Sequence, residues 1–237
     1  YNYYTNLKPQ NHRAPRVSLY AYGKDYHRVL KKKLALLLDH IRNEIGDVSG
    51  RAFVDSAPIL ERAWAARSGL GWLGKNATLI NRQQGSFFFL SELLLDLELE
   101  YDSPIGDFCA DCRLCIDACP TGAIVEPYVI DARRCISYVT IESKGDIPPE
   151  LAGRLGNWLF GCDICQEVCP FNQQAIPHQE PQFAPRPELL RMTANQWREM
   201  TEVQFEELFQ GSVVKRTGYD GLRRNLAFLK RESAEDG

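Results

Sequence analysis

Eight cysteines fall mainly into two runs whose spacing is typical of iron–sulfur ligands. The first run has the spacing C-x2-C-x2-C-x3-C, followed by a proline, and consists of Cys109, Cys112, Cys115 and Cys119. The second run is shorter because Leu159 fills its first position, and it consists of Cys162, Cys165 and Cys169. Three thiolates at this tight spacing, completed by a distant fourth, bind a 4Fe–4S cubane. The sequence therefore predicts two cubanes and one-electron chemistry.

The eight cysteines are just enough for two clusters. In two-cluster proteins with this motif, the fourth cysteine of a run binds the other cluster. Cys135 is the one cysteine outside both runs, and it replaces the missing member of the second run. We therefore predict one cluster bound by Cys109, Cys112, Cys115 and Cys169. We predict a second cluster bound by Cys119, Cys135, Cys162 and Cys165.

Disulfides and zinc are the alternatives for these thiols. Disulfide-dense domains are small and secreted, whereas this chain has 237 residues. Structural zinc uses two separated pairs of ligands for each metal ion, which fits three closely spaced cysteines less well than a cubane does. We therefore favour the clusters, with zinc as the second choice.

Composition is that of an ordinary soluble globular protein, with 44% hydrophobic and 25% charged residues. The net charge of −3 excludes a global positive field for nucleic acid but leaves room for a local basic patch. No apolar run reaches membrane-spanning length, and no export signal is visible. Because cluster thiolates fit a reducing compartment, we expect a cytoplasmic protein without a membrane partner. The sequence starts at Tyr1 without a methionine, so we expect a preceding segment.

Residues 1–104 alternate between helical and strand patterns. A stripe of leucines and isoleucines predicts a helix from Tyr26 to Gly46, and Pro58 can open a second helix at about 59–68. Strands are predicted at about 16–22, 51–55, 77–80 and 86–95, the last two joined by a hairpin. This order favours an α+β core over a regular parallel α/β repeat.

The segment from Gly69 to Gly74 matches G-x-G-x-x-G by its letters. A dinucleotide fingerprint must follow a strand and open a helix, whereas here a helix precedes the glycines and a strand follows them. We therefore reject nicotinamide binding. A backbone loop that approaches a large planar ligand stays possible, because glycine permits close contact.

The remaining chain divides into a cluster module at 105–175 and a C-terminal part at 176–237. Within the module, each cysteine run leads into a short helix, and residues 131–142 form an inserted helix that carries Cys135. Four prolines follow Phe171 and argue against regular structure in this connector. Helices are predicted around Trp197, around 205–209 and at 219–231.

Asp55 is the carboxylate that the pattern selects, since it ends an apolar strand beside the glycine-rich segment. An aspartate there also commonly caps the next turn. The pattern alone therefore leaves both a catalytic and a structural role open.

Several segments resemble epoxyqueuosine reductase, and together they cover nearly the whole chain. In the cysteine region they are residues 109–124, 131–142 and 161–170. Upstream they are residues 22–27, 53–58, 66–75 and 85–90. Generic two-cluster ferredoxins share only the cysteine runs.

This resemblance implies a cobalamin-dependent iron–sulfur enzyme that acts on tRNA in queuosine synthesis. The implied fold is a cobalamin-binding core like that of reductive dehalogenases, of which part precedes Tyr1, followed by a ferredoxin-like module and C-terminal helices. The implied reaction removes the epoxide oxygen of epoxyqueuosine at the wobble position and leaves a cyclopentene ring. Two clusters would supply single electrons to the cobalt, drawn from an electron donor that the sequence does not identify.

The resemblance also implies roles for individual residues. Asp55 inherits the role of proton donor and cobalamin neighbour, and burial would raise its pKa for that task. The further implied cobalamin contacts are Asn76, Thr78, Ser137, Tyr138 and Thr140. The basic candidates for tRNA phosphates are Lys144, Arg216, Lys215, Arg133, Arg134, Arg223 and Arg224.

Three other functions stay open at this stage. A plain electron-transfer protein would bind no corrin, and a reductive dehalogenase would use the same machinery on an organohalide. A tRNA-binding module would keep its clusters for structure alone. We expect a monomer.

Overall fold

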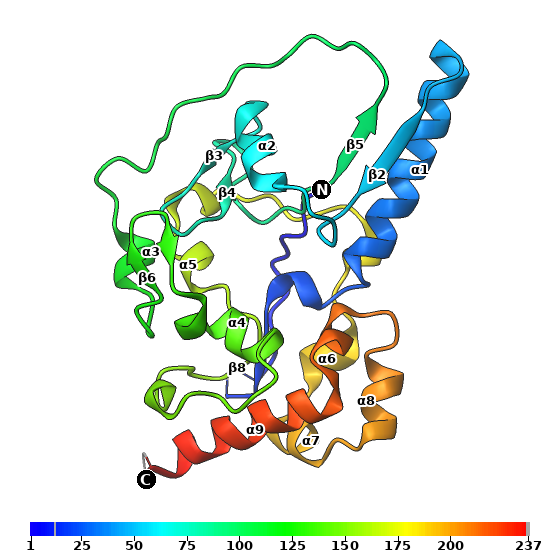
Figure 1. Cartoon of the computed structure of the whole chain (residues 1–237). Helices are drawn as coiled ribbons and strands as arrows, with labels where there is room; N and C mark the ends of the chain where they lie inside the picture. Colours follow the sequence, from blue (N-terminus) through cyan, green and yellow to red (C-terminus); the bar gives the residue numbers. More distant parts are fainter. Residues whose placement is uncertain (12, 236–237) are drawn as a thin grey trace.

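The computed structural model describes residues 1–11 and 13–235, and its longest helix lies near the N-terminus. Helix α1 (Tyr26–Ile45) starts where the Asp25 side chain accepts a hydrogen bond from the backbone N–H of His27. It ends at Gly46, whose φ of 123° suits glycine. These limits match the predicted helix. The fully buried residues of α1 are Val29, Leu30 and Leu34, all in its first half, whereas its second half lies beside β2 and β5 at the edge of the molecule (Figure 1).

The strands of the described residues form four separate two-stranded sheets. The antiparallel pairs are β2 (Gly50–Phe53) with β5 (Glu92–Leu95), β3 (Trp72–Leu73) with β4 (Leu79–Ile80), and β6 (Ile124–Glu126) with β7 (Val129–Ile130). The one parallel pair is β1 (Arg16–Val17) with β8 (Trp158–Phe160). The long strand predicted at 86–95 is therefore wrong for its first half, where Phe88 makes a single bridge to Asn2.

Short helices fill the rest of the chain. The α-helices are α2 (Glu61–Arg67), α3 (Leu114–Asp117), α4 (Ile136–Ile141), α5 (Ile164–Glu167), α6 (Pro187–Arg191), α7 (Ala194–Glu199), α8 (Glu202–Leu208) and α9 (Gly218–Glu235). The 3-10 helices are η1 (Leu19–Ala21), η2 (Ala132–Arg134), η3 (Pro149–Leu151), η4 (Pro170–Asn172), η5 (Pro181–Phe183) and η6 (Val213–Arg216). The three predicted C-terminal helices correspond to α7, α8 and α9.

Two predictions about these helices need correction. The inserted helix at 131–142 is split, because Cys135 is extended at φ −73° and ψ 124° between η2 and α4. The proline-rich connector contains η5 and α6, both of which begin at a proline. Proline fits the first turn of a helix, where its missing N–H costs no hydrogen bond.

The C-terminal helices pack on the N-terminal segment. One buried cluster joins Val17 and Tyr22 to Phe160 of β8 and to Phe205 and Phe209 of the C-terminal part. In Figure 1, α9 accordingly runs beneath β8 and α4, with α6, α7 and α8 grouped beside it. The cluster module is thus held between the two ends of the chain.

The glycines of the 69–74 segment serve close backbone packing between β3 and β4. A Cβ on Gly71 would lie 2.3 Å from the carbonyl oxygen of Ile80, and one on Gly69 would lie 2.5 Å from that of Ser103. Gly69 also has a φ of 68°. Ser103 belongs to the long segment that arcs from β5 to the cluster module (Figure 1). These contacts explain the glycines without a ligand.

Candidate functional site

Four cysteines of the predicted first cluster line one cavity of about 200 Å³. They are Cys109, Cys112, Cys115 and Cys169, so the cavity draws on both cysteine runs. Helices α3 and α5, each only four residues long, place the runs side by side. Lys75, Phe108 and Phe171 complete much of the wall. The structure therefore brings this predicted set together.

Three of the four cysteines in the predicted second set, Cys135, Cys162 and Cys165, lie close enough to influence the pKa of Cys162 and Cys165. Cys135 and Cys165 both raise the pKa of the Cys162 thiol, after the larger effect of burial. Burial likewise raises the pKa of Cys165, with Cys135 as the next cause. Cys119 accepts a hydrogen bond from the backbone N–H of Ala123 at 3.3 Å. Against the effect of burial, the hydrogen bonds with Thr121 and Ala123 lower the pKa of Cys119. The thiols of Cys162 and Cys165, whose pKa is raised, instead stay protonated until a metal replaces the proton.

The donor chemistry fits cubanes. All eight cysteines are free thiols, which excludes the disulfide alternative in this structure. Within the described residues, no three metal-binding side chains converge on a single ion. A cubane does not need such convergence, because its four thiolates bind four different iron atoms.

Asp55 lies in the turn that follows β2 and has a φ of 53°, which is unusual outside glycine. Its Oδ2 accepts a hydrogen bond from the Tyr26 hydroxyl at 2.8 Å and lies 3.2 Å from Nε2 of His27. The Asp55 backbone N–H donates to Glu61 of α2. Its side chain stays 51% exposed. The turn therefore presents this carboxylate at the surface with two fixed neighbours.

The pKa of Asp55 is lowered, which contradicts the predicted rise. The hydrogen bond with His27 is the largest cause, and it outweighs the partial burial that acts in the other direction. The Tyr26 hydroxyl lowers it further. In this structure Asp55 is therefore ionised at neutral pH.

His27, the neighbour of Asp55, is protonated at neutral pH. Its Nδ1 lies 2.7 Å from Oδ1 of Asp25, and its Nε2 faces Asp55. Hydrogen bonds to Asp25 and then to Asp55 raise the pKa of His27 to about 9 against the opposing effect of burial. The imidazole is consequently a cation at neutral pH and donates from both nitrogens. Burial, together with the Asp55 charge, also raises the pKa of Tyr26.

Two glutamates, Glu61 and Glu92, form a carboxylate pair next to the Asp55 turn. Burial raises the pKa of Glu92 to about 8, and its hydrogen bond with Glu61 adds to the rise. Glu92 thus keeps its proton at neutral pH and leaves Glu61 free to accept the N–H of Asp55. This pair fixes the turn.

Two predicted tRNA contacts lie near this site. Arg216 of η6 forms a two-pronged ion pair with Glu142, at 2.8 and 3.0 Å. The charges of Arg216 and Asp55 influence each other's pKa, so the two side chains lie in the same neighbourhood. The ammonium group of Lys144 donates to the backbone carbonyl of Arg216 at 3.5 Å.

The other basic candidates bind within the protein. Arg224 donates to three backbone carbonyls, those of Val139, Ser143 and Gly145. Lys215 forms an ion pair with Glu206, and Arg133 forms one with Asp131. Arg223 donates a hydrogen bond to the backbone carbonyl of Arg198. The Arg134 guanidinium lies close to Gly122.

The predicted cobalamin contacts differ in their availability. Asn76 is buried, bonds to the carbonyl of Cys165 at 3.4 Å and accepts from Thr78, so it belongs to the cluster loops. Thr140 is completely buried, and its hydroxyl donates to the Ile136 carbonyl and accepts from Gly161. Its side chain therefore leaves no atom for a cofactor, and we remove it from the predicted contacts.

Ser137 and Tyr138 of α4 remain available. Ser137 is half-buried, and Tyr138 is 42% exposed. Together with the half-buried Thr78, these side chains offer hydroxyl groups of the kind that hydrogen-bond the amide arms of a corrin. The donor chemistry of these three residues fits the cofactor.

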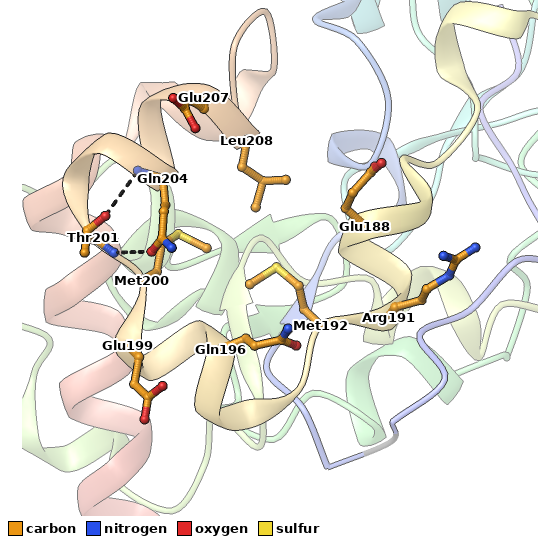
Figure 2. A pocket seen from close by; sticks show the side chains of 10 residues that line it. All are labelled: Glu188, Arg191, Met192, Gln196, Glu199, Met200, Thr201, Gln204, Glu207 and Leu208. Atoms are coloured by element: carbon orange, nitrogen blue, oxygen red, sulfur yellow. Dashed lines mark hydrogen bonds between the residues drawn. The ribbon is translucent and has the colours of Figure 1, made fainter.

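A groove of about 820 Å³ lies elsewhere, between α6, α7 and α8 (Figure 2). The ten described side chains that line it come from residues 188–208. Glu188, Glu199 and Glu207 give it an acidic rim, which disfavours phosphate binding. None of the ten lining residues is a predicted site residue, so the groove is separate from the predicted sites.

Sequence reasoning assigned no role to Tyr26, His27 or Trp72. A signal for the first two existed in the polar triplet Asp25-Tyr26-His27 at a helix start, because a helix N-terminus fixes such side chains in space. Trp72 had no such signal, since its partner Cys109 lies 37 positions away.

Known proteins resemble this chain along almost its full length. Residues 108–172 match the family model of a 4Fe-4S double cluster binding domain, and residues 1–56 match one described as "Epoxyqueuosine reductase QueG, DUF1730". The epoxyqueuosine reductase of Cellulophaga algicola is 54% identical over 228 residues, which are 95% of this chain and 74% of that protein.

Solved structures agree in fold. One is an epoxyqueuosine reductase with an epoxyqueuosine-modified tRNA-Tyr stem loop (TM-score 0.84, 34% identity, 95% of this chain). Another, from Bacillus subtilis, has an aspartate-bearing catalytic loop swung out of the active site (TM-score 0.88, 34% identity, 98% of this chain). This chain spans 62% of each solved chain and about three quarters of the Cellulophaga relative. No helix in the described residues has the length and apolar character to cross a membrane.

Proposed function

Because the chain belongs to the epoxyqueuosine reductase family, we propose that it reduces epoxyqueuosine to queuosine at the wobble position of tRNA. The observation that carries this proposal is a proton-holding pair, Asp55 and His27, in the same fold as a double 4Fe-4S module. The reaction converts an epoxide into an alkene. It consumes two electrons and two protons and releases the oxygen as water, so it needs both parts.

The cluster ligands follow the predicted crossed pattern. One cluster takes the four cysteines that share the 200 Å³ cavity. The other takes Cys119, Cys135, Cys162 and Cys165, whose mutual influence on pKa supports the assignment for three of them. When bound, the clusters would supply one-electron chemistry, with electrons drawn from an external one-electron donor. A reducing cytoplasm keeps these thiols from forming disulfides.

When bound, cobalamin would supply a strongly reducing cobalt centre. Thr78, Ser137 and Tyr138 would hold its polar arms through their hydroxyl groups. Asp55 would lie against it, since this turn presents its carboxylate outward.

Proton delivery falls to Asp55 and His27 acting together. Asp55 is ionised, but His27 carries a proton 3.2 Å from its Oδ2. A shift of that proton along the hydrogen bond gives Asp55 the acid form needed to deliver the first of the two protons to the departing oxygen. His27, whose pKa is raised, takes up a proton from solvent to recharge the pair for the second. Asp25 stabilises the imidazolium and keeps the ring in place. The pair thus stores an acid at neutral pH without a buried carboxylic acid.

The tRNA substrate would meet this site over Lys144 and Arg216. Both are exposed, and the charge of Arg216 acts on the pKa of Asp55. Phosphate contacts need only such a local basic face on a chain with net negative charge. The target base sits in an anticodon loop, where it can leave its stack at low cost.

The test is turnover of an epoxyqueuosine-modified stem loop by the anaerobically purified protein with both clusters and cobalamin. Asp55→Asn removes the acid but keeps the shape of the side chain. We expect a loss of at least about 100-fold, as for other general acids. Asp39→Asn is the matched control, because Asp39 lies on exposed α1 and its side chain is 68% exposed.

The variants must first be shown to contain two clusters each and to give the cobalamin spectrum of the unmodified protein. Full turnover by Asp55→Asn under these conditions would remove Asp55 as proton donor. Absence of turnover in the unmodified, fully loaded protein would contradict the proposed reaction itself.

A further inference from the structure

Trp72 is aimed at a cluster ligand. Its indole Nε1 donates a hydrogen bond to Sγ of Cys109 at 3.4 Å, and the side chain is 3% exposed. Pairing of Trp72 with Ile80 in the β3–β4 sheet fixes the backbone. The ring packs edge-on against Phe108 and Phe171, with centroids 5.1 and 4.8 Å away. This N–H is therefore held on the sulfur by a rigid frame.

The tryptophan bridges both cysteine runs. It shares one buried cluster with Cys169 of the second run, and Cys109 of the first run packs against that cluster. Both thiols line the same cavity. The indole ring therefore packs beside ligands from both runs.

Lys75 brings a positive charge to the same cavity. Its ammonium group donates to the backbone carbonyls of Ala110 and Cys112, the latter at 3.0 Å. Both carbonyls belong to the loop that carries the first cysteine run, and Lys75 itself lines the cavity. Lys75 follows Trp72 by three residues, just after β3, and its side chain reaches the cluster loop.

Hydrogen bonds and nearby cations act on cluster potentials in one direction. One-electron reduction adds a negative charge to the cluster and its sulfurs. A donor N–H and a cation stabilise that added charge more than they stabilise the oxidised form, and burial strengthens the effect. Both groups therefore favour the reduced cluster.

We propose that Trp72 and Lys75 raise the reduction potential of the cluster bound by Cys109, Cys112, Cys115 and Cys169. They are positioning residues that touch the ligands and their loop, and their effect is on electron supply. This inference rests on the cluster assignment made above. It adds the residues that set how readily this cluster accepts its electron.

The test is a redox titration of the purified protein with dithionite and mediators, followed by electron paramagnetic resonance. Trp72→Phe keeps an aromatic ring and removes the N–H, and Lys75→Met keeps the length and removes the charge. Each should shift one midpoint to a lower potential and leave the other in place. The expected size is about tenfold in the reduction equilibrium, which is about 59 mV for a one-electron couple.

Two controls accompany these variants. Trp64→Phe makes the same substitution at a tryptophan of α2 that is 58% exposed, and it should leave both midpoints unchanged. Lys75→Arg keeps the charge, so its midpoint should stay close to that of the unmodified protein and show little of the downward shift expected for Lys75→Met. Iron and sulfide analysis establishes two cubanes in each variant before titration.

The outcomes separate this inference from the proposed function. Unmodified protein with fewer than two cubanes would contradict the cluster assignment. Two cubanes with unchanged midpoints in both Trp72→Phe and Lys75→Met would overturn the present inference and leave that assignment standing. If Trp72→Phe loses its cluster, Lys75→Met decides alone, because its side chain lies outside the packed ring frame.

Discussion

The pKa of His27 is expected to lie well above that of an ordinary histidine. Of its two carboxylate partners, Asp25 is expected to contribute more to this rise than Asp55. The ring lies 2.7 Å from Asp25 and 3.2 Å from Asp55. The Asp25 side chain is also the better shielded of the two, at 24% exposed against 51% for Asp55. Asp25→Asn should therefore lower the pKa of His27 more than Asp55→Asn does.

The magnitude follows from the shift. The pKa of His27 rises from 6.5 to about 9. At about 1.4 kcal/mol for each pKa unit, this difference corresponds to about 3 kcal/mol. Solvent screening at half-exposed Asp55 reduces it to about 2 kcal/mol. We expect Asp25→Asn to remove more than half of the shift. The double variant should fall to or below 6.5, because burial alone lowers the pKa of His27.

The assay is nuclear magnetic resonance of protein labelled at histidine, with the clusters oxidised, between pH 5 and 10. The chain contains only four histidines, so the His27 signal can be assigned with one His27→Gln variant. The exposed His40 on α1 provides an internal reference that neither substitution should affect. An unmodified His27 that titrates near 6.5 would refute the reasoning. So would a larger effect of Asp55→Asn than of Asp25→Asn.

The same shift has a consequence for stability. A histidine whose pKa is raised by folding stabilises the folded state fully below its unfolded pKa of about 6.5. That contribution is lost as the pH rises through about 9. Between pH 6.5 and 9, the unmodified protein should therefore lose about 2 kcal/mol relative to His27→Gln. Denaturant unfolding at both pH values measures this difference.

Three further predictions concern packing and tRNA. Gly71→Ala should destabilise the fold by about 1–3 kcal/mol in thermal unfolding, because its Cβ would meet the carbonyl oxygen of Ile80. Lys144→Ala should weaken stem-loop binding and reduce the slope of log K against log salt by about 1, whereas Lys32→Ala on α1 should leave the slope unchanged. Arg224→Met should cost about 2–3 kcal/mol in denaturant unfolding, since three carbonyls lose their donor; an unchanged midpoint would contradict that role.

The cysteine spacing carried most of what could be predicted. Ligand spacing is a local property of the chain, and Cys135 followed from counting, so both sets could be proposed without coordinates. Helix α1 was equally accessible, because its capping aspartate and terminal glycine are local signals. Strands were harder to predict. The segment 86–95 is apolar enough for a long strand, but only 92–95 finds a partner, in β2.

Long-range contacts explain the errors at the site. A raised pKa was predicted for Asp55 because the proton-donor role implied by the resemblance needs one, with burial against the corrin and apolar neighbours as the expected cause. The partners that reverse it, Tyr26 and His27, lie 29 and 28 positions earlier in the chain. Thr140 was similarly assigned to a cofactor, whereas Gly161 and Ile136 occupy its hydroxyl. Polar side chains reveal their role only when all their partners are known.

One buried carboxylate connects the electron and proton sides of the proposed reaction. Asp163 lies between Cys162 and Ile164 in the second cysteine run and is 1% exposed. It accepts a hydrogen bond from the Ser18 hydroxyl and another, at 2.8 Å, from the backbone N–H of Leu19. Leu19 begins η1, which leads within a few residues to Asp25 and α1. Because Asp163 is buried, the cluster loop and the start of η1 cannot separate without exposing its carboxylate. The Asp163 hydrogen bonds therefore tie the loop of the second cysteine run to the segment that precedes α1.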